Sequence, residues 1–310
     1  MSEHRFDGRV AVVTGAGRGI GRAHALLLAD RGASVVVNDL GGSIEGDGSD
    51  AAPASAVAGE IVAAGGAARA DSSDVATAAG ARALVDGALQ QFGRLDILVN
   101  NAGIVRWAGL PEADEDNLAR HLAVHVGGSF NTARAAWPHM VEQGYGRIVM
   151  TTSTGMLGLP NNLSYATAKA AVVGLTRSLT TAGAEHGIKV NLIAPAAWTR
   201  MAGRAGDDDE RGGPADMSPE LVAPMVALLA HEDCPVSGEI YAAGMGRFAR
   251  IFIASTPGYV HAGEGAPTIE DVARHWAEIN DETGYSVPTD LNDWSAAFTA
   301  HLFNGPGAPA

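Results

Sequence analysis

Short apolar runs alternate with longer Ala-rich stretches along most of this chain, and this alternation restricts the possible folds most strongly. The runs include VAVV, SVVV, DILV and RIVM, which are nearly continuous and therefore typical of strands covered on both faces. The pattern predicts strands at residues 10–14, 34–39, 67–70, 95–100, 147–152, 189–194 and 239–242, and helices at 20–31, 76–92, 114–144, 162–186 and 219–230. We therefore expect an α/β fold with a Rossmann-type doubly wound parallel sheet.

The pattern loosens after Pro195, and the last part of the chain has helical periodicity at 269–280 and 290–303. No flexible linker separates this part from the rest, and the sequence contains no internal repeat. We therefore expect a main α/β domain at residues 1–249 and a C-terminal helical extension at residues 250–310 that packs on it.

Composition excludes several classes of partner. The formal net charge of the 310 residues is −14, which disfavours nucleic acid and anionic membranes. The single cysteine, Cys234, excludes an intramolecular disulfide and a multi-cysteine metal site, and we expect no metal. The N-terminal MSEHRFDGRV has no apolar core of signal-peptide length, and no window approaches the roughly 20 apolar residues of a membrane span. We expect a cytoplasmic protein that acts on a small molecule.

A glycine-rich segment, TGAGRGIG, lies between the first predicted strand and the first predicted helix. Glycines there allow a tight turn, and they let backbone N–H groups approach a pyrophosphate at the N-terminus of the helix. The spacing is G-x-x-x-G-x-G rather than the common G-x-G-x-x-G. The predicted cofactor-binding residues of this segment are Gly15, Arg18, Gly19, Ile20 and Gly21.

Asp39 ends the second predicted strand, about 20 residues further on, where an acidic residue meets the adenosine ribose of a bound dinucleotide. A carboxylate there repels a 2′-phosphate, so the sequence favours NAD over NADP. Arg18 is a contrary signal, because a cation in the glycine-rich segment can pair with that phosphate. We give Asp39 more weight than Arg18. The alternative for Asp39 is that it is an ordinary exposed aspartate at the start of a turn.

Two further strand ends supply candidate cofactor-binding residues. Asp74 and Val75 follow the third strand and either bracket the adenine or belong to an ordinary loop. The fourth strand closes with Asn100, Asn101, Ala102 and Gly103, where an asparagine side chain can tie strand ends together behind the cofactor.

Tyr165 and Lys169 lie four positions apart in the predicted helix 162–186, so both side chains project from one face. The pKa of free tyrosine is about 10. A nearby ammonium and a positive nicotinamide are expected to lower it by favouring the phenolate. Tyr165 is therefore a candidate acid for a ketone and base for an alcohol, just after a strand that ends in hydroxyl residues, 151–153.

These motifs together resemble the short-chain dehydrogenase/reductase family over residues 9–246. The matching segments are TGAGRGIG, NNAG, the hydroxyl cluster before YATAK, and Pro195 at a strand end. The resemblance implies hydride transfer at a nicotinamide, a hydroxyl that polarises the substrate oxygen, and proton transfer through Tyr165. It also implies that Lys169 binds the nicotinamide ribose, and that Tyr165, Pro195 and Thr199 face the cofactor, with Thr199 at the carboxamide.

The sequence departs from the family pattern at three places. The family's usual spacing before the tyrosine selects Thr152 as the substrate-binding hydroxyl, whereas counting from the start of the strand selects Ser153. We prefer Ser153, because a one-residue deletion fits the following loop more easily than a buried strand. His125 replaces the family's relay asparagine, either as a neutral imidazole on a water relay or as a helix-packed side chain. Ala196 replaces the usual glycine.

Within the family, the segments VVNDLGG, VHVGGSF and APAAWTRM resemble the dehydrogenase part of type 2 peroxisomal multifunctional enzymes, which are related to type 4 17β-hydroxysteroid dehydrogenases. That resemblance implies (3R)-hydroxyacyl-CoA or some hydroxysteroids as substrates. We place no match on the chain beyond Arg250.

The leading hypothesis is an NAD(H)-dependent oxidoreductase that interconverts a secondary alcohol and its ketone. The expected alcohol is a 3-hydroxyacyl-CoA. Candidate cations for the CoA are Arg200, Arg204, Arg247 and Arg250. The alternative is a hydroxysteroid or terpenoid alcohol dehydrogenase, with Met140, Met156, Leu157, Trp198 and Met201 as candidate pocket residues. A non-catalytic NAD-sensing module is the third hypothesis. We expect a homodimer or homotetramer that pairs the helices 114–144 and 162–186 across a two-fold axis.

Overall fold

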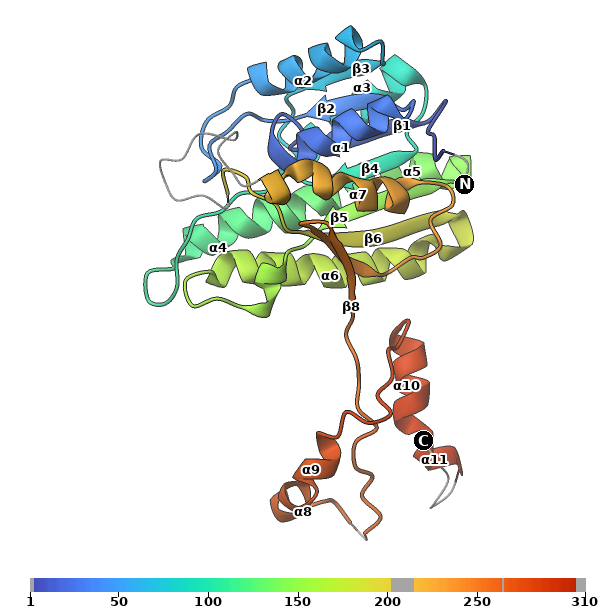
Figure 1. Cartoon of the computed structure of the whole chain (residues 1–310). Helices are drawn as coiled ribbons and strands as arrows, with labels where there is room; N and C mark the ends of the chain where they lie inside the picture. Colours follow the sequence, from blue (N-terminus) through green and yellow to red (C-terminus); the bar gives the residue numbers. More distant parts are fainter. Residues whose placement is uncertain (1–2, 202–214, 264, 305–310) are drawn as a thin grey trace. The chain divides into compact units, whose positions relative to one another are not determined.

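The computed structural model describes residues 3–201, 215–263 and 265–304. The chain divides into two compact units, Met1–Arg250 and Ile251–Ala310, so the boundary falls one residue after the predicted one. The first unit is built around a single sheet with helices on both faces (Figure 1). This arrangement confirms the α/β fold and the helical C-terminal part; that this part packs on the main domain stays a prediction.

The sheet has eight strands in the order β3-β2-β1-β4-β5-β6-β7-β8. Their bounds are β1 Val10–Thr14, β2 Ser34–Asn38, β3 Ala68–Asp71, β4 Ile97–Asn100, β5 Gly146–Thr151, β6 Ile188–Pro195, β7 Ile240–Gly244 and β8 Arg247–Ile251. All neighbouring pairs from β3 to β7 run parallel. The order reverses beside β1, and in such sheets ligands bind at the carboxyl ends of the strands near this point.

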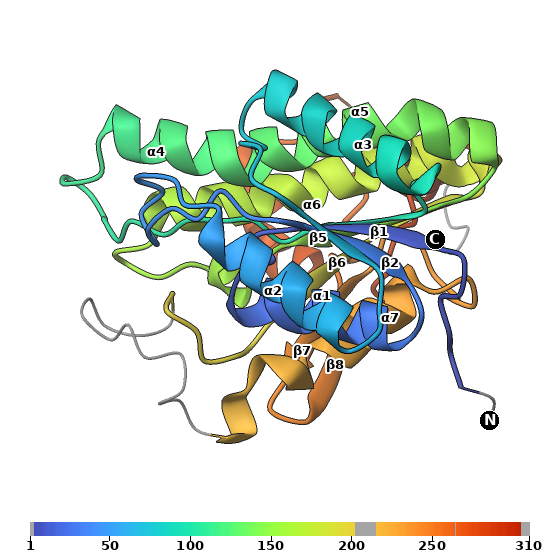
Figure 2. The ribbon, with the colours of Figure 1, turned by 90° about the horizontal axis from the view of Figure 1, so that it is seen from above.

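Two layers of helices cover the sheet (Figure 2). Their bounds are α1 Gly19–Asp30, α2 Ala52–Ala63, α3 Ala78–Phe92, α4 Glu115–His121, α5 Gly128–Gln143, α6 Leu163–Gly183 and α7 Ala223–Ala230. Helices α1, α2 and α7 lie on one face, and α3 to α6 lie on the other. The strands between them are buried, with residues such as Val12, Leu98 and Ile148 at 0% exposure. Burying each such side chain stabilises the fold by about 1.5–3 kcal/mol.

Strand β8 was not predicted. It follows β7 after the two residues Met245 and Gly246, and a connection this short joins neighbouring strands only when they run antiparallel. Its sequence, RFARI, has no fully buried residue, so it lacks the apolar signal by which the other strands were recognised.

The helical stretch predicted over residues 114–144 is present, but it is not α-helical throughout. A π-helix at Leu122–Gly127 separates α4 from α5, and it carries His125. Such wide turns occur often at functional sites, and sequence periodicity does not reveal them. Pro138 lies inside α5, and the helix is capped at its end by Gly144, which has a φ of +63°.

The second unit contains four short helices, and none of its described residues is buried. The helices are α8 Ile269–Arg274, α9 Trp276–Ile279, α10 Leu291–Thr299 and α11 His301–Asn304. Its internal contacts include a bridge between Ser255 and Ser286 and stacking of Phe252 on Tyr285. The described part of this unit therefore has no hydrophobic core of its own.

Candidate active site

One cavity lies at the carboxyl ends of the central strands and collects most of the predicted cofactor-binding residues. Those that line it are Gly15, Arg18, Gly19, Ile20, Gly21, Asp39, Asp74, Val75, Asn101, Ala102, Gly103 and Thr199. The predicted residues outside its lining are Pro195 at the end of β6, and Ser153, Tyr165, Lys169 and His125. Lining residues that the sequence did not single out include Asn38, Ser43, Ile44, Ser73 and Val124.

The glycines of the β1–α1 turn leave room for a phosphate. Gly15 has a φ of +62°, and a Cβ there would lie 2.8 Å from Cα of Ala102. A Cβ on Gly21 would overlap the carbonyl of Gly15. Helix α1 begins at Gly19, and the side chain of its N-cap residue, Arg18, makes no capping hydrogen bond. The first turn of α1 has backbone N–H groups that can donate to a pyrophosphate, and the absence of side chains at Gly15 and Gly21 leaves space for it.

Asp39 is held by the backbone beside this turn. Its two carboxylate oxygens accept hydrogen bonds from N–H of Gly17 at 2.8 Å and from N–H of Gly41 at 2.7 Å. A Cβ at position 17 would lie 2.8 Å from the carboxylate, so only glycine allows this approach. Each oxygen keeps a lone pair for a ribose hydroxyl, whereas a phosphate would meet a fixed negative charge.

Asn101 joins the ends of β1 and β4. Its side-chain amide donates to the carbonyl oxygens of Thr14 and Gly15, each at 3.0 Å. The backbone N–H groups of Asn101 and Ala102 in turn donate to the hydroxyl of Thr14, again at 3.0 Å. These bonds fix the floor of the cavity at the reversal of strand order.

The structure separates the roles of the two candidate hydroxyls. Thr152 is fully buried and donates to the carbonyl oxygen of Lys169 at 2.7 Å, which ties β5 to α6. Ser153 caps the short helix Thr154–Leu157, and its hydroxyl is close enough to Tyr165 to oppose the rise in the pKa of that phenol. Ser153 is therefore the hydroxyl that can reach an oxygen held at the phenol, which supports the preference for it.

In the protein without cofactor, burial outweighs any effect of Lys169 on the pKa of Tyr165, and the lowered pKa expected with a positive nicotinamide bound stays a prediction. Burial raises the pKa of Tyr165 above 10, and the neighbouring Ser153 hydroxyl opposes this less strongly. Burial also lowers the pKa of Lys169 to about 7, so its positive charge is incomplete at neutral pH. The Lys169 Nζ lies 5.5 Å from the centre of the Tyr165 ring and donates to the carbonyl oxygen of Thr151 at 2.9 Å. Desolvation outweighs the attraction because both groups are buried.

His125 is buried behind Tyr165, with its ring edge-on at 5.4 Å. Its Nε2 lies 2.8 Å from the carbonyl oxygen of Ile104, and its buried Nδ1 has no partner among the described residues. Burial, and then the charge of Lys169, hold the pKa of His125 well below 6.5, so the imidazole is neutral. The ring also lies against Gly103, where a Cβ would be 2.5 Å from its Cε1. His125 is thus helix-packed, yet its Nδ1 has no hydrogen-bond partner among the described residues.

Two aromatic neighbours of Tyr165 were missed. His121 stacks on His125 at 5.9 Å and lies edge-on to Tyr165 at 6.3 Å. His121 lies four residues before His125, which places both side chains on one face of a helix, so this spacing could have indicated His121 as a site residue. Trp107 lies 6.5 Å from Tyr165 and is 50% exposed, but its position depends on loop packing that the sequence does not encode locally.

The loop that carries Trp107 lies beside the start of α6, which carries Tyr165, and the segments around this contact present apolar side chains. Residue Ala108 bridges to Asn162, just before α6. The exposed leucines of these segments are Leu110, Leu157, Leu159 and Leu163. Of the residues expected to line an apolar pocket, Met201 lines the cavity, whereas Met140 is fully buried against Gly146 at the other end of the sheet and was wrongly assigned.

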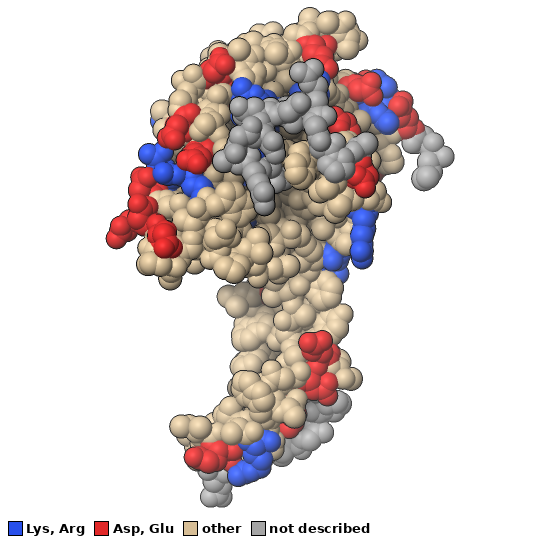
Figure 3. Space-filling view, turned by 60° about the vertical axis from the view of Figure 1, so that its left-hand side comes forward, with Lys and Arg blue, Asp and Glu red and all other residues tan. Residues whose placement is uncertain are grey.

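The arginines expected to bind CoA have different surroundings. Arg200 lines the cavity. Arg250 makes a two-bond ion pair with Glu239, at 2.6 and 2.8 Å, and is therefore a poor candidate. Arg247 is exposed on β8, and Arg204 lies outside the described residues. Figure 3 shows acidic and basic side chains side by side on one face of the first unit rather than a continuous basic area.

Comparison with known proteins agrees with this site. Residues 9–210 match the family described as short chain dehydrogenase. The chain is 38% identical over 307 residues to the peroxisomal hydratase-dehydrogenase-epimerase of Neurospora crassa, covering 98% of this chain and 34% of that protein. The full-length peroxisomal multifunctional enzyme type 2 of Drosophila melanogaster aligns with a TM-score of 0.79 and 32% identity, covering 96% of this chain and 50% of that one.

A third similar structure is a 7α-hydroxysteroid dehydrogenase in complex with NADH and 7-oxo glycochenodeoxycholic acid. It aligns with a TM-score of 0.68 and 31% identity, covering 78% of this chain and 95% of that one. The chain thus spans about a third of the Neurospora relative and half of the Drosophila enzyme. Both alignments extend beyond Arg250, where the sequence analysis had placed no match.

A glycine-lined cavity at the carboxyl ends of the strands, together with a tyrosine and a lysine four residues apart on α6, suits a dinucleotide-dependent oxidoreductase. The chain belongs to the short-chain dehydrogenase family. No helix among the described residues is long and apolar enough to cross a bilayer.

Proposed function

We propose that this chain uses NAD(H) to interconvert a 3-hydroxyacyl-CoA and the corresponding ketone. The observation that carries the proposal is the position of Tyr165. The neighbouring Ser153 hydroxyl opposes the rise in the pKa of this phenol on burial, and the ring lies beside apolar side chains that are exposed to solvent. The name of the Neurospora relative, a hydratase-dehydrogenase-epimerase of peroxisomes, supports a substrate from acyl-chain chemistry.

In alcohol oxidation a hydride leaves the carbon and a proton leaves the hydroxyl oxygen. A nicotinamide cofactor held by Gly15, Gly19 and Asp39 would supply the hydride acceptor. Ser153 holds the substrate oxygen, and the Tyr165 phenolate takes the hydroxyl proton. Lys169 stabilises that phenolate, and Nδ1 of His125 holds a water through which the proton leaves the buried phenol. Ketone reduction uses the same groups in reverse, with the Tyr165 phenol as acid.

An acyl chain and a CoA pose different demands on the site. An acyl chain fits the apolar loops beside Tyr165, where Trp107, Leu157 and Leu159 are at least half exposed. A pyrophosphate of CoA needs cations, and Arg200 at the cavity is the candidate that the structure supports best. A hydroxysteroid is the second candidate substrate, since the same apolar loops fit a sterol and a hydroxysteroid dehydrogenase shares the fold.

A spectrophotometric panel separates these substrates. Purified full-length chain is assayed with 3-hydroxyacyl-CoA, hydroxysteroids and terpenoid alcohols, each with NAD and with NADP. Saturation with hydroxyacyl-CoA, but not with free hydroxysteroids, is the expected result. The reverse pattern would establish the second candidate, and no turnover of any alcohol would contradict the proposed activity.

The cofactor preference rests on Asp39. We expect NAD to be preferred over NADP by at least about tenfold in kcat/KM, because the fixed carboxylate repels the 2′-phosphate. Asp39→Ala should improve the use of NADP, measured as kcat/KM with each cofactor. Asp39→Asn is the matched control, since it removes the charge but keeps the shape. If neither variant improves NADP use, the role given to Asp39 is wrong.

The direction of the pKa shift on Tyr165 predicts opposite pH profiles for the two reactions. Because burial raises its pKa, the phenol form dominates at neutral pH and the phenolate fraction rises about tenfold per pH unit below that pKa. We expect kcat/KM for alcohol oxidation to rise between pH 7 and 9, while kcat/KM for ketone reduction stays nearly constant. NAD affinity over the same range is the control. An oxidation rate independent of pH would show that another group is the base.

The oligomeric state and location remain proposals. The helices expected to pair across a two-fold axis expose apolar side chains, among them Leu118 and Phe130, which favours a homodimer or homotetramer. A cytoplasmic location is proposed from the sequence, whereas the Neurospora relative is named as peroxisomal. Gel filtration with light scattering, and imaging of the tagged chain in its own cells, decide these points.

A further inference from the structure

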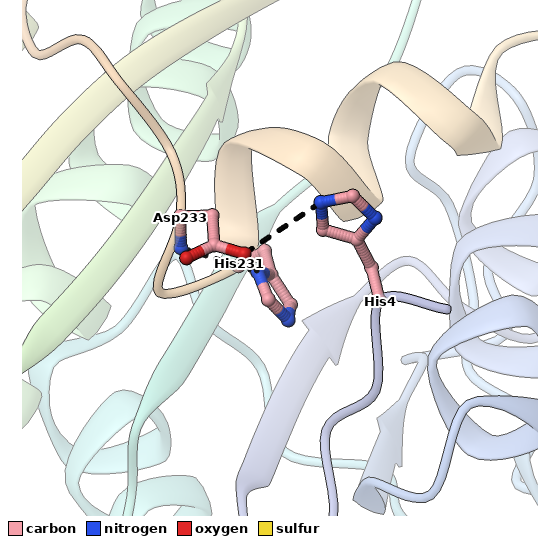
Figure 4. A group of neighbouring side chains, drawn as sticks. All are labelled: His4, His231 and Asp233. Atoms are coloured by element: carbon pink, nitrogen blue, oxygen red, sulfur yellow. Dashed lines mark hydrogen bonds and ion pairs between the residues drawn. The ribbon is translucent and has the colours of Figure 1, made fainter. Parts of the chain in front are cut away.

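Two histidines and an aspartate from distant parts of the sequence lie together away from the active site. His4 belongs to the N-terminal segment, and His231 and Asp233 belong to the turn after α7 (Figure 4). The neighbouring Glu232 pairs with Arg9, directly before β1. The group therefore lies at the amino ends of the strands, whereas the catalytic residues lie at their carboxyl ends.

The spacing of the three side chains fits a small cation. One potential ligand atom of each residue lies within 4.8 Å of those of the other two. Oδ2 of Asp233 is 3.5 Å from Nδ1 of His231 and 3.7 Å from Nε2 of His4. Ligand atoms bound to Zn²⁺ at about 2.0–2.1 Å in tetrahedral geometry are about 3.3 Å apart. His4 and Asp233 are exposed and can close the remaining distance by side-chain rotation.

The buried histidine is already oriented as a ligand. His231 is 5% exposed, and its Nε2 lies 3.0 Å from the carbonyl oxygen of Arg5, to which it donates. The ring of Phe6 packs edge-on against it at 5.2 Å. With the proton on Nε2, the lone pair of Nδ1 points toward Asp233. In the structure this lone pair accepts a hydrogen bond from the backbone N–H of Asp233 at 3.1 Å. Histidine ligands commonly donate their second nitrogen to a backbone carbonyl, which fixes the ring.

We propose that His4, His231 and Asp233 form a binding site for a divalent first-row cation such as Zn²⁺, with water at the open position. Two imidazoles and a carboxylate suit such an ion. The cation takes the place of the Asp233 N–H at Nδ1 and fastens the N-terminal segment to the turn after α7. Its role is structural, because it is bound at the opposite end of the sheet from Tyr165. No metal was expected from the sequence, because its single cysteine excludes a multi-cysteine site. A site built from histidine and aspartate was not considered.

Calorimetric titration of the untagged, chelator-treated full chain with ZnCl₂ tests the site. We expect one Zn²⁺ per chain and a rise in Tm with Zn²⁺, because a ligand that binds only the folded state stabilises it. His4→Ala and Asp233→Asn should each weaken binding at least about tenfold and remove the rise in Tm. His231 is left intact, since replacing it would also break its bond to Arg5 and its packing on Phe6.

The matched control is His186→Ala, which removes an exposed histidine elsewhere on the first unit. It should leave the affinity, the stoichiometry and the rise in Tm unchanged. Equal loss in this variant, unchanged binding in both site variants, or no binding at millimolar Zn²⁺ would each overturn the proposal. Circular dichroism of each variant without Zn²⁺ confirms that all of them are folded.

Discussion

Tyr165→Phe is expected to lower kcat by about 10²–10⁴-fold, because it removes only the hydroxyl that exchanges a proton with the substrate. The ring, its edge-on contact with His125 and its packing on α6 are kept. The measurement is steady-state turnover of the best alcohol and ketone of the substrate panel, together with NADH binding by fluorescence.

NADH affinity that stays within a few-fold of the wild-type value shows that the fold and cavity survive the change. Ser153→Ala is the companion variant, since it removes the other hydroxyl at the reacting oxygen. If Tyr165→Phe retained full turnover, the proton would pass by another route. If the unaltered chain bound NAD but turned over no alcohol, the NAD-sensing module would become the leading hypothesis.

Gly21→Ala is expected to lower the free energy of unfolding by about 1–3 kcal/mol and to weaken NADH binding at least about tenfold. A Cβ there overlaps the carbonyl of Gly15 and the side-chain nitrogen of Asn101, so the backbone of the phosphate turn must shift. Urea denaturation and NADH titration measure the two effects separately.

Gly59→Ala is the matched control for that change. Gly59 also lies inside a helix, α2, but it is exposed and no atom lies within 4 Å of an added Cβ. Alanine there should stabilise the chain by about 0.5–1 kcal/mol and leave NADH binding unchanged, because glycine is a poor helix former. Similar losses in both variants would mean that close packing at Gly21 is not the cause.

The sequence was most informative where function depends on residues at the ends of strands. TGAGRGIG, Asp39 and Asn101 follow consecutive strand ends, and parallel strands bring such positions to one edge of a sheet. The fold was predictable for the same reason, since the buried strands are continuous apolar runs. Strand β8, with exposed arginines, gave no such signal.

Other features of the site depend on tertiary packing and were beyond the sequence. The choice between Thr152 and Ser153 depends on tertiary contacts such as the bond of Thr152 to the backbone of α6, which the sequence does not reveal. The π-helix of His125 and the approach of Trp107 to Tyr165 arise from how loops and helices pack. The rise in the pKa of Tyr165 without cofactor was beyond the sequence, because the sequence shows a neighbouring charge but not the loss of solvent around the phenol.

The contact between Gly103 and His125 couples two positions that are 22 residues apart in the sequence. The imidazole occupies the space that any side chain at position 103 would need. Substitutions at these two positions must therefore occur in a fixed order. His125 has to be replaced by a smaller residue before Gly103 can be replaced by a residue with a side chain. A chain with a side chain at position 103 would accordingly need a residue smaller than histidine at position 125.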